Sequence, residues 1–234
     1  MSTTNDLISI AKNEQTVYDA GKKAEYDAFW DGTQSKGSRI NYSYGFSGVG
    51  WTDKTFKPKY DIVPRPANGI FQQCSITNLT SILNACGVTL DLSQSDNNDY
   101  LFNGCQNMTH IPIIDLTGQS ATRRVANYTF NVCRNLVRIE KVILPSDGSM
   151  TFTGTFGTCN SLAYIRFDGV IGNTISFSAS PLDKDSFADI IAHLSDTVTG
   201  KTITFNKTAK EAAFTADEWK TLTDTKKNWT FSLV

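Results

Sequence analysis

The chain has 234 residues, with 22 basic and 23 acidic side chains that give a net charge of -1 at pH 7. A nearly neutral chain with 40% hydrophobic residues is typical of a folded protein and excludes wholesale disorder. It also argues against nucleic-acid binding, which needs a clustered basic surface. No run of about 18 apolar residues occurs, so we expect no insertion into a membrane.

Residues 1–35 are predicted to form an amphipathic helix. Asn5 or Asp6 suits the N-cap, and apolar residues recur at three- and four-residue spacing at Leu7, Ile10, Val17, Ala24 and Ala28. The helix either packs on its own domain or forms a homo-oligomer by coiled-coil pairing, which would make it an anchor. The polar stretch Ser2–Asp6 predicts no signal peptide and therefore synthesis in a cytoplasm.

Residues 36–68 form an aromatic-rich connector that ends near Pro64 and Pro66. Exposed aromatic rings in loops can stack on sugars, so the candidate surface-binding residues are Tyr42, Tyr44, Phe46 and Trp51. The alternative is that these rings cover the open end of a repeat array, because any such array needs a cap.

A pattern of Phe, then Cys after three residues, then two aliphatic residues recurs through residues 69–180. The structural repeat core is predicted to consist of Phe71, Cys74, Phe102, Cys105, Phe130, Cys133, Phe156 and Cys159. Successive cysteines are 31, 28 and 26 residues apart, which is the spacing of stacked repeats. A single copy cannot bury these side chains until a neighbour stacks on it, so we expect both residue types to be core.

The cysteines are expected to be reduced and structural rather than paired in disulfides. There is no CxxC motif, and the two histidines, His110 and His193, lack the spacing of metal ligands. We therefore expect no metal and no other cofactor. Asp91, Asp115 and Asp168 lie at similar repeat positions, where a carboxylate pair or a calcium site is the alternative to ordinary solvated acids.

Short β-branched segments bounded by turn residues follow the copies of the pattern. They predict strands at Ile113–Leu116, Lys141–Leu144, Ile165–Phe167 and Ile175–Phe177. Residues 181–234 are predicted to form an α/β cap. Its elements are a helix that Pro181 and Asp183 open, a strand at Lys201–Phe205, a helix within Ala209–Leu222 and a last strand at Trp229–Val234.

The repeating units resemble the BspA-type leucine-rich repeats, F-x-x-C-x-x-L-x-x-I followed by a strand. This resemblance implies a β-rich α/β repeat fold, namely a leucine-rich-repeat solenoid with an N-terminal helix and an α/β C-terminal cap. Similar repeats occur in bacterial surface and secreted adhesins and in proteins encoded among phage and prophage structural genes. The stretches that are similar to the leader and terminus of prophage-encoded proteins of gut bacteria are Val17–Asp31, Trp51–Tyr60 and Phe214–Leu233.

The resemblance implies a non-enzymatic phage virion or tail-associated protein that binds the host surface. Its expected partners are a bacterial surface protein or glycan and other virion proteins. A bacterial adhesin at the cell surface and a carbohydrate-active enzyme are the alternatives. The sequence carries no recognisable nucleophile triad, and the glycines at Gly45, Gly48 and Gly50 lack the Lys-Ser/Thr of a phosphate loop.

Overall fold

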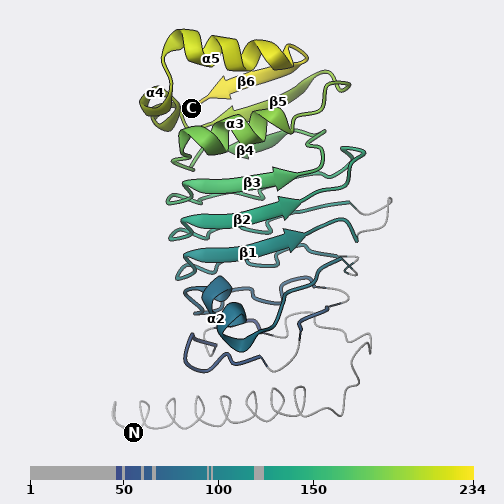
Figure 1. Cartoon of the computed structure of the whole chain (residues 1–234), viewed down its shortest axis with the longest axis vertical. Helices are drawn as coiled ribbons and strands as arrows, with labels where there is room; N and C mark the ends of the chain where they lie inside the picture. Colours follow the sequence, from purple (N-terminus) through teal and green to yellow (C-terminus); the bar gives the residue numbers. More distant parts are fainter. Residues whose placement is uncertain are drawn as a thin grey trace, which may run out of the picture. The chain divides into compact units, whose positions relative to one another are not determined.

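The computed structural model describes residues 46–48, 51–58, 61–64, 67–93, 95, 97–118 and 124–234 (Figure 1). The chain divides into two compact units, Met1–Ser38 and Arg39–Val234. All described residues belong to the second unit, so the helix predicted for residues 1–35 lies outside them.

The described residues form two parallel sheets and several helices. The sheet orders are β1-β2-β3 and β4-β5-β6. In chain order the elements are α2 (Leu79–Cys86), β1 (His110–Asp115), β2 (Arg138–Ile143), β3 (Tyr164–Asp168), β4 (Ile175–Phe177), α3 (Lys184–Ala192), β5 (Lys201–Phe205), α4 (Lys207–Ala213), α5 (Ala216–Thr223), the 3-10 turn η1 (Asp224–Lys226) and β6 (Trp229–Leu233).

The first sheet places equivalent residues of successive chain turns side by side. Ile111 pairs with Ile139, which pairs with Ile165, and all three side chains are fully buried. The strands predicted from sequence are confirmed, although β1 and β2 each begin three residues before the predicted starts. Inward-facing β-branched residues on parallel strands therefore form one side of the core.

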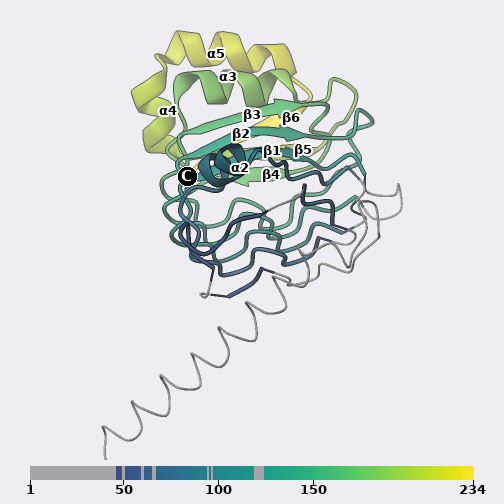
Figure 2. The same ribbon diagram turned by 60° about the horizontal axis from the view of Figure 1, so that its bottom comes forward.

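The edge of β3 is covered by a helix. Asp183 caps the N-terminus of α3, and α3 lies next to β3 while α5 lies next to α3 (Figure 2). The Ser186 hydroxyl and the Asp189 carboxylate of α3 accept hydrogen bonds from the backbone N–H groups of β3, at 3.0 and 2.7 Å. These side chains satisfy donors that a fourth strand would otherwise pair with.

The expectation of a leucine-rich-repeat solenoid with an α/β C-terminal cap is wrong for the described residues. Their strands form two separate three-stranded sheets, accompanied by helices α2 to α5, instead of one continuous repeat sheet. The cause is that α3 occupies the edge of β3, so strand pairing there stops. β4 pairs instead with β5, so the ranges 69–180 and 181–234 both contribute strands to the second sheet.

Six phenylalanine rings form a stack through the core, with neighbouring centroids between 4.5 and 6.1 Å apart. The rings are those of Phe71, Phe102, Phe130, Phe156, Phe177 and Phe205. All are buried, and most neighbouring rings lie within about 16° of parallel, with 27° for the Phe156–Phe177 pair. This stack joins the chain turns that carry β1 to β3 to the second sheet.

The buried cysteines hydrogen-bond to the preceding chain turn. The thiols of Cys105, Cys133 and Cys159 donate to the carbonyl oxygens of Phe71, Phe102 and Phe130, at 2.7, 3.0 and 3.0 Å. Burial raises the pKa of the Cys159 thiol to about 12. A protonated thiol is the form that can donate, so these cysteines act as small apolar side chains that each satisfy one carbonyl group.

Two helical features differ from the prediction. The helix α2 was not predicted; Asn78 caps its N-terminus, and Gly87 ends it in a left-handed conformation with φ +66°. The helix predicted within Ala209–Leu222 is two helices, because the chain is extended at Phe214 and Thr215 begins α5 with a capping box. No helix within the described part of the chain is long and apolar enough to cross a membrane.

Candidate binding surface

The outer face of β1-β2-β3 carries the side chains that alternate with the buried isoleucines. In register across the three strands stand His110, Arg138 and Tyr164, each half-buried. A parallel sheet holds such side chains at fixed spacing, since each strand is bonded to its neighbour. This face therefore offers a preset group of polar and aromatic side chains.

Tyr164 is held between two arginines. The guanidinium carbon of Arg138 lies 3.5 Å from the centroid of the Tyr164 ring, and that of Arg166 lies 4.2 Å from it. Both distances are within the range of cation–π attraction. Arg166 is itself fixed by hydrogen bonds to the Ile165 carbonyl and the Ser186 hydroxyl, each 2.9 Å long. The aromatic ring and both cations are thus ordered before any ligand arrives.

The basic groups of this face each have an acidic neighbour. Arg138 donates to both carboxylate oxygens of Glu140, at 2.8 and 3.0 Å, and this hydrogen bonding raises the pKa of the Arg138 guanidinium. Lys141 lies 3.8 Å from the Asp168 carboxylate, and Arg166 lies 3.9 Å from that of Asp185. Because these basic and acidic groups compensate each other, the face suits a protein partner with both polar and apolar groups better than a polyanion.

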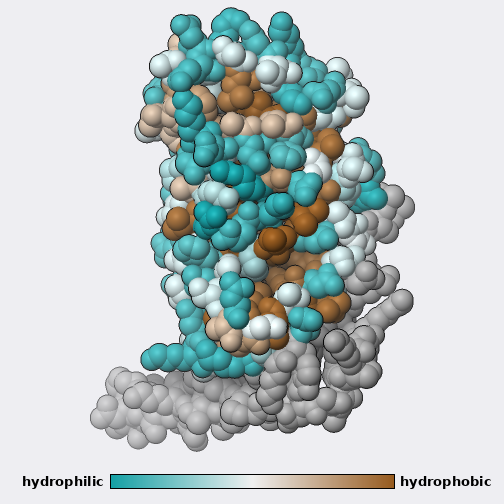
Figure 3. All heavy atoms as spheres, in the orientation of Figure 1, coloured by the Kyte–Doolittle hydropathy of each residue, from teal (hydrophilic) through white to brown (hydrophobic). Residues whose placement is uncertain are grey.

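Exposed aliphatic side chains accompany the charged ones. Ile113 of β1 is 51% exposed, and Val137, immediately before β2, is 41% exposed. Figure 3 shows hydrophilic side chains over β2 and β3 with hydrophobic ones beside them. Tyr, Arg and aliphatic groups on one face form the mixture that binds proteins.

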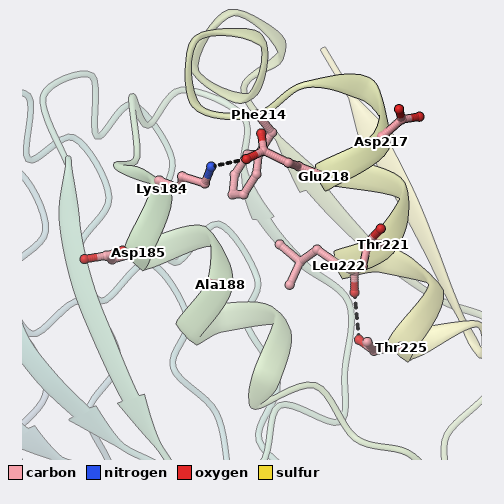
Figure 4. Close-up of a pocket in the computed structure, with 9 residues that line it drawn as sticks. All are labelled: Lys184, Asp185, Ala188, Phe214, Asp217, Glu218, Thr221, Leu222 and Thr225. Carbon is pink, nitrogen blue, oxygen red and sulfur yellow. Dashed lines mark hydrogen bonds and ion pairs between the residues drawn. The ribbon is translucent and has the colours of Figure 1, made fainter.

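A groove of about 630 Å³ lies between α3 and α5 (Figure 4). Its lining includes Ala188, Phe214 and Leu222, and an ion pair between Lys184 and Glu218, 2.7 Å long, lies at one end. Hydrogen bonding from Lys184 lowers the pKa of the exposed Glu218 carboxyl to about 2. The lysine ammonium also lies 5.0 Å from the Phe214 ring centroid, so these contacts hold the two helices together.

The candidate surface predicted in residues 36–68 is corrected by the structure. Phe46 is 3% exposed and Trp51 is 7% exposed, and both rings pack against Phe56. Rings that are buried in an aromatic cluster cannot stack on a ligand. Tyr42 and Tyr44 lie outside the described residues.

The remaining predicted residues lie in the core or at strand ends. The structure buries all eight residues of the repeat pattern: Phe71, Cys74, Phe102, Cys105, Phe130, Cys133, Phe156 and Cys159. Asp115 and Asp168 both stand opposite Ile143, and Asp91 caps its own turn by accepting from the Ser93 N–H. Within the described ranges, no three or more His, Cys, Asp or Glu side chains form a group that could hold a metal ion.

The surface around Tyr164 was not predicted from the sequence. Arg138 and Tyr164 are 26 residues apart in the chain and become neighbours only through the pairing of β2 with β3. The available signal was the alternation of polar and β-branched residues in each strand, which marks one solvent-facing side.

Comparison of the chain with protein-family models, with curated protein sequences and with solved structures gave no match.

Proposed function

We propose that this protein is a non-enzymatic component of a phage virion, associated with the tail, and that the outer face of β1-β2-β3 binds a protein on the bacterial surface. The observation that carries the binding role is the Tyr164 ring held between the Arg138 and Arg166 guanidinium groups.

The order of this group favours binding. Tyr and Arg are the residue types that most often dominate the energy of protein interfaces, and fixed side chains lose little further entropy when a partner docks. Arg138 is fixed by Glu140 and Arg166 by Ser186, so the two cations that contact the Tyr164 ring are themselves held in place.

The aliphatic neighbours of the group support the same role. Ile113 and Val137 are exposed on or beside the strands that carry the arginines. A partner that covered them would gain apolar burial around a polar centre, which is the usual composition of a protein interface.

The virion location rests on the sequence. The stretches at Val17–Asp31 and Phe214–Leu233 resemble the leader and terminus of prophage-encoded proteins. The binding role and the virion location are independent parts of the proposal, so each has its own test.

The binding role is tested with the purified full chain and host cells in a pull-down assay. Tyr164→Ala should lower the apparent affinity by about tenfold or more, the loss expected for an interface anchor. Lys207→Ala on α4, whose side chain is 61% exposed, is the matched control and should bind as wild type. Equal binding by Tyr164→Ala, with an unchanged unfolding midpoint, would remove this face from the proposal.

The location is tested by mass spectrometry of virions purified after prophage induction. The proposal expects the chain at a fixed ratio to tail proteins. Its recovery in the host cell envelope, and not in virions, would favour the bacterial adhesin instead.

A further inference from the structure

Tyr100 and Tyr128 form a stacked aromatic pair away from the phenylalanine core. Their ring centroids are 5.2 Å apart and the ring planes differ by 10°. Tyr100 is 38% exposed and Tyr128 is half-buried. Stacked rings shield the faces that meet, so the exposed aromatic surface of this pair lies on the outer parts of the rings, mainly that of Tyr100.

Backbone hydrogen bonds place these tyrosines in a series with two glycines. The series runs from Gly69 through Tyr100 and Tyr128 to Gly154. The backbone N–H of each of the first three residues donates to the carbonyl oxygen of the residue that precedes the next member, at 3.0, 3.0 and 2.9 Å. All four residues have positive φ, at 63°, 58°, 54° and 61°.

Tyrosine is an unfavourable choice for this backbone conformation. A positive φ brings Cβ close to the backbone, and glycine avoids that contact. Two of the four equivalent positions use glycine and two keep a large aromatic residue. Positive φ also occurs at Gln73, Val132 and Thr158, so the turns of this fold hold it without glycine. What distinguishes Tyr100 and Tyr128 is that their rings stack on each other and reach the surface.

The glycines at the ends of the series make room for the rings. A Cβ at Gly154 would lie 2.6 Å from Cε1 of Tyr128, so the Tyr128 ring occupies the space over this glycine. On the other side of the pair, Gly69 adds no side chain beside Tyr100. Tyr100 is the more exposed of the two tyrosines, at 38%, so its ring offers the surface on which a ligand can stack.

A second row of polar side chains accompanies the tyrosines. Asn103 and Asn131 stand three residues after Tyr100 and Tyr128, and in each case the asparagine N–H donates to the tyrosine carbonyl, at 2.9 and 3.1 Å. Each tyrosine and its asparagine are thus the two ends of one tight turn. Nδ2 of Asn131 donates to Oδ1 of Asn103 over 3.1 Å, which orients both carboxamides.

We infer that Tyr100, Tyr128, Asn103 and Asn131 form a binding site for a neutral pyranose glycan. The apolar face of a pyranose ring stacks on the exposed surface of the Tyr100 ring, while sugar hydroxyls exchange hydrogen bonds with the carboxamides, which can both donate and accept. This site is separate from the β1-β2-β3 face and does not depend on the function proposed for that face.

The test uses the full chain and three neutral probes, namely cellotetraose, maltotetraose and chitotetraose. Saturation-transfer NMR identifies a bound probe, and isothermal titration calorimetry measures its affinity. Tyr100→Gly should weaken that affinity by about tenfold or more, the equivalent of one lost aromatic contact with its hydrogen bonds. Tyr100→Phe, which keeps the ring, should retain most of the affinity.

The substitution to glycine separates binding from folding. The φ of 58° at Tyr100 is one that glycine adopts freely, so Tyr100→Gly removes the ring without adding backbone strain, and its unfolding midpoint is measured beside its affinity. Tyr128→Gly is the second variant of this kind. If none of the three probes binds the wild-type chain, or if both glycine variants bind as well as wild type, the inference is overturned.

The test also distinguishes this site from the protein-binding face. Tyr164→Ala should leave glycan affinity unchanged, because Tyr164 lies on β3 and its ring contacts Arg138 and Arg166. Loss of glycan binding in Tyr164→Ala, with Tyr100→Gly unaffected, would assign the glycan to the sheet face and contradict the inference.

Discussion

The Asp189 carboxylate accepts a hydrogen bond from the backbone N–H of Phe167, with 2.7 Å between Oδ2 and the nitrogen. Asp189 belongs to α3 and Phe167 to β3, so a helix side chain ends the hydrogen-bonding edge of a parallel sheet. The same carboxylate lies 3.6 Å from Nδ1 of His193 one helical turn later.

Loss of this acceptor should destabilise the fold. Asp189→Ala leaves the Phe167 N–H without a partner, and we expect a loss of about 1–3 kcal/mol in the free energy of unfolding. Asp189→Asn keeps an acceptor oxygen and should lose less. Asp185→Ala, on the same helix with a side chain that is 85% exposed, is the control for urea unfolding. Equal stability of all three variants would show that the bond does not hold the edge.

The interior of the phenylalanine stack should be sensitive to truncation. Phe130 is fully buried between Phe102 and Phe156, so Phe130→Ala should cost about 3–5 kcal/mol in the free energy of unfolding. Val137→Ala, at a site that is 41% exposed, should change stability by less than about 0.5 kcal/mol. A small loss for Phe130→Ala, measured by chemical denaturation, would mean that the stack can collapse around the gap.

The buried thiols should resist labelling in the native protein. Cys105, Cys133 and Cys159 are fully buried and burial raises the pKa of each thiol, so little reactive thiolate is available. Cys86 is only partly buried and is the internal control. A maleimide time course followed by mass spectrometry should show modification of Cys86 first. Simultaneous modification of all four would contradict the buried hydrogen-bonded arrangement.

Alkaline pH should weaken the fold through the same thiols. In the unfolded chain a cysteine ionises near its ordinary pKa of 9.0, whereas Cys159 in the folded chain keeps its proton until about 12. The folded state then binds more protons, so its stability falls as pH rises through this window, by up to about 1.4 kcal/mol per pH unit for one thiol. Urea unfolding between pH 8 and 10.5 measures the slope, and Cys159→Ala should reduce it. An identical slope in that variant would assign the effect to other groups.

The local elements of this fold could largely be predicted from sequence. Turn residues and β-branched pairs located the C-terminal halves of β1 and β2. Their first residues, His110 and Arg138, were missed because they lie on the outer face, where polar side chains carry no signal of burial. The helix α2 was missed because its residues lie within the predicted repeat region 69–180, although Asn78 and Gly87 are suitable caps.

The division into two sheets could not be predicted in the same way. It depends on Ser186 and Asp189 reaching the backbone of β3, and these are ordinary polar residues in a helical pattern. Similarly, Phe46 and Trp51 were interpreted either as surface-binding residues or as a cap of the repeat array, because aromatic side chains among glycines suit both a loop and a core. Only the contacts of both rings with Phe56 show that they belong to the core.

The regular sequence separation between paired residues has a consequence for folding kinetics. Thiol hydrogen bonds join residues 34, 31 and 29 positions apart, and the β1-β2 pairs are all 28 positions apart. These loops are short compared with the 234-residue chain, so closing each one costs a similar and modest entropy. Any two adjacent chain turns can then form a folding nucleus. The next turn packs on this nucleus before contacts between residues far apart in the sequence have formed.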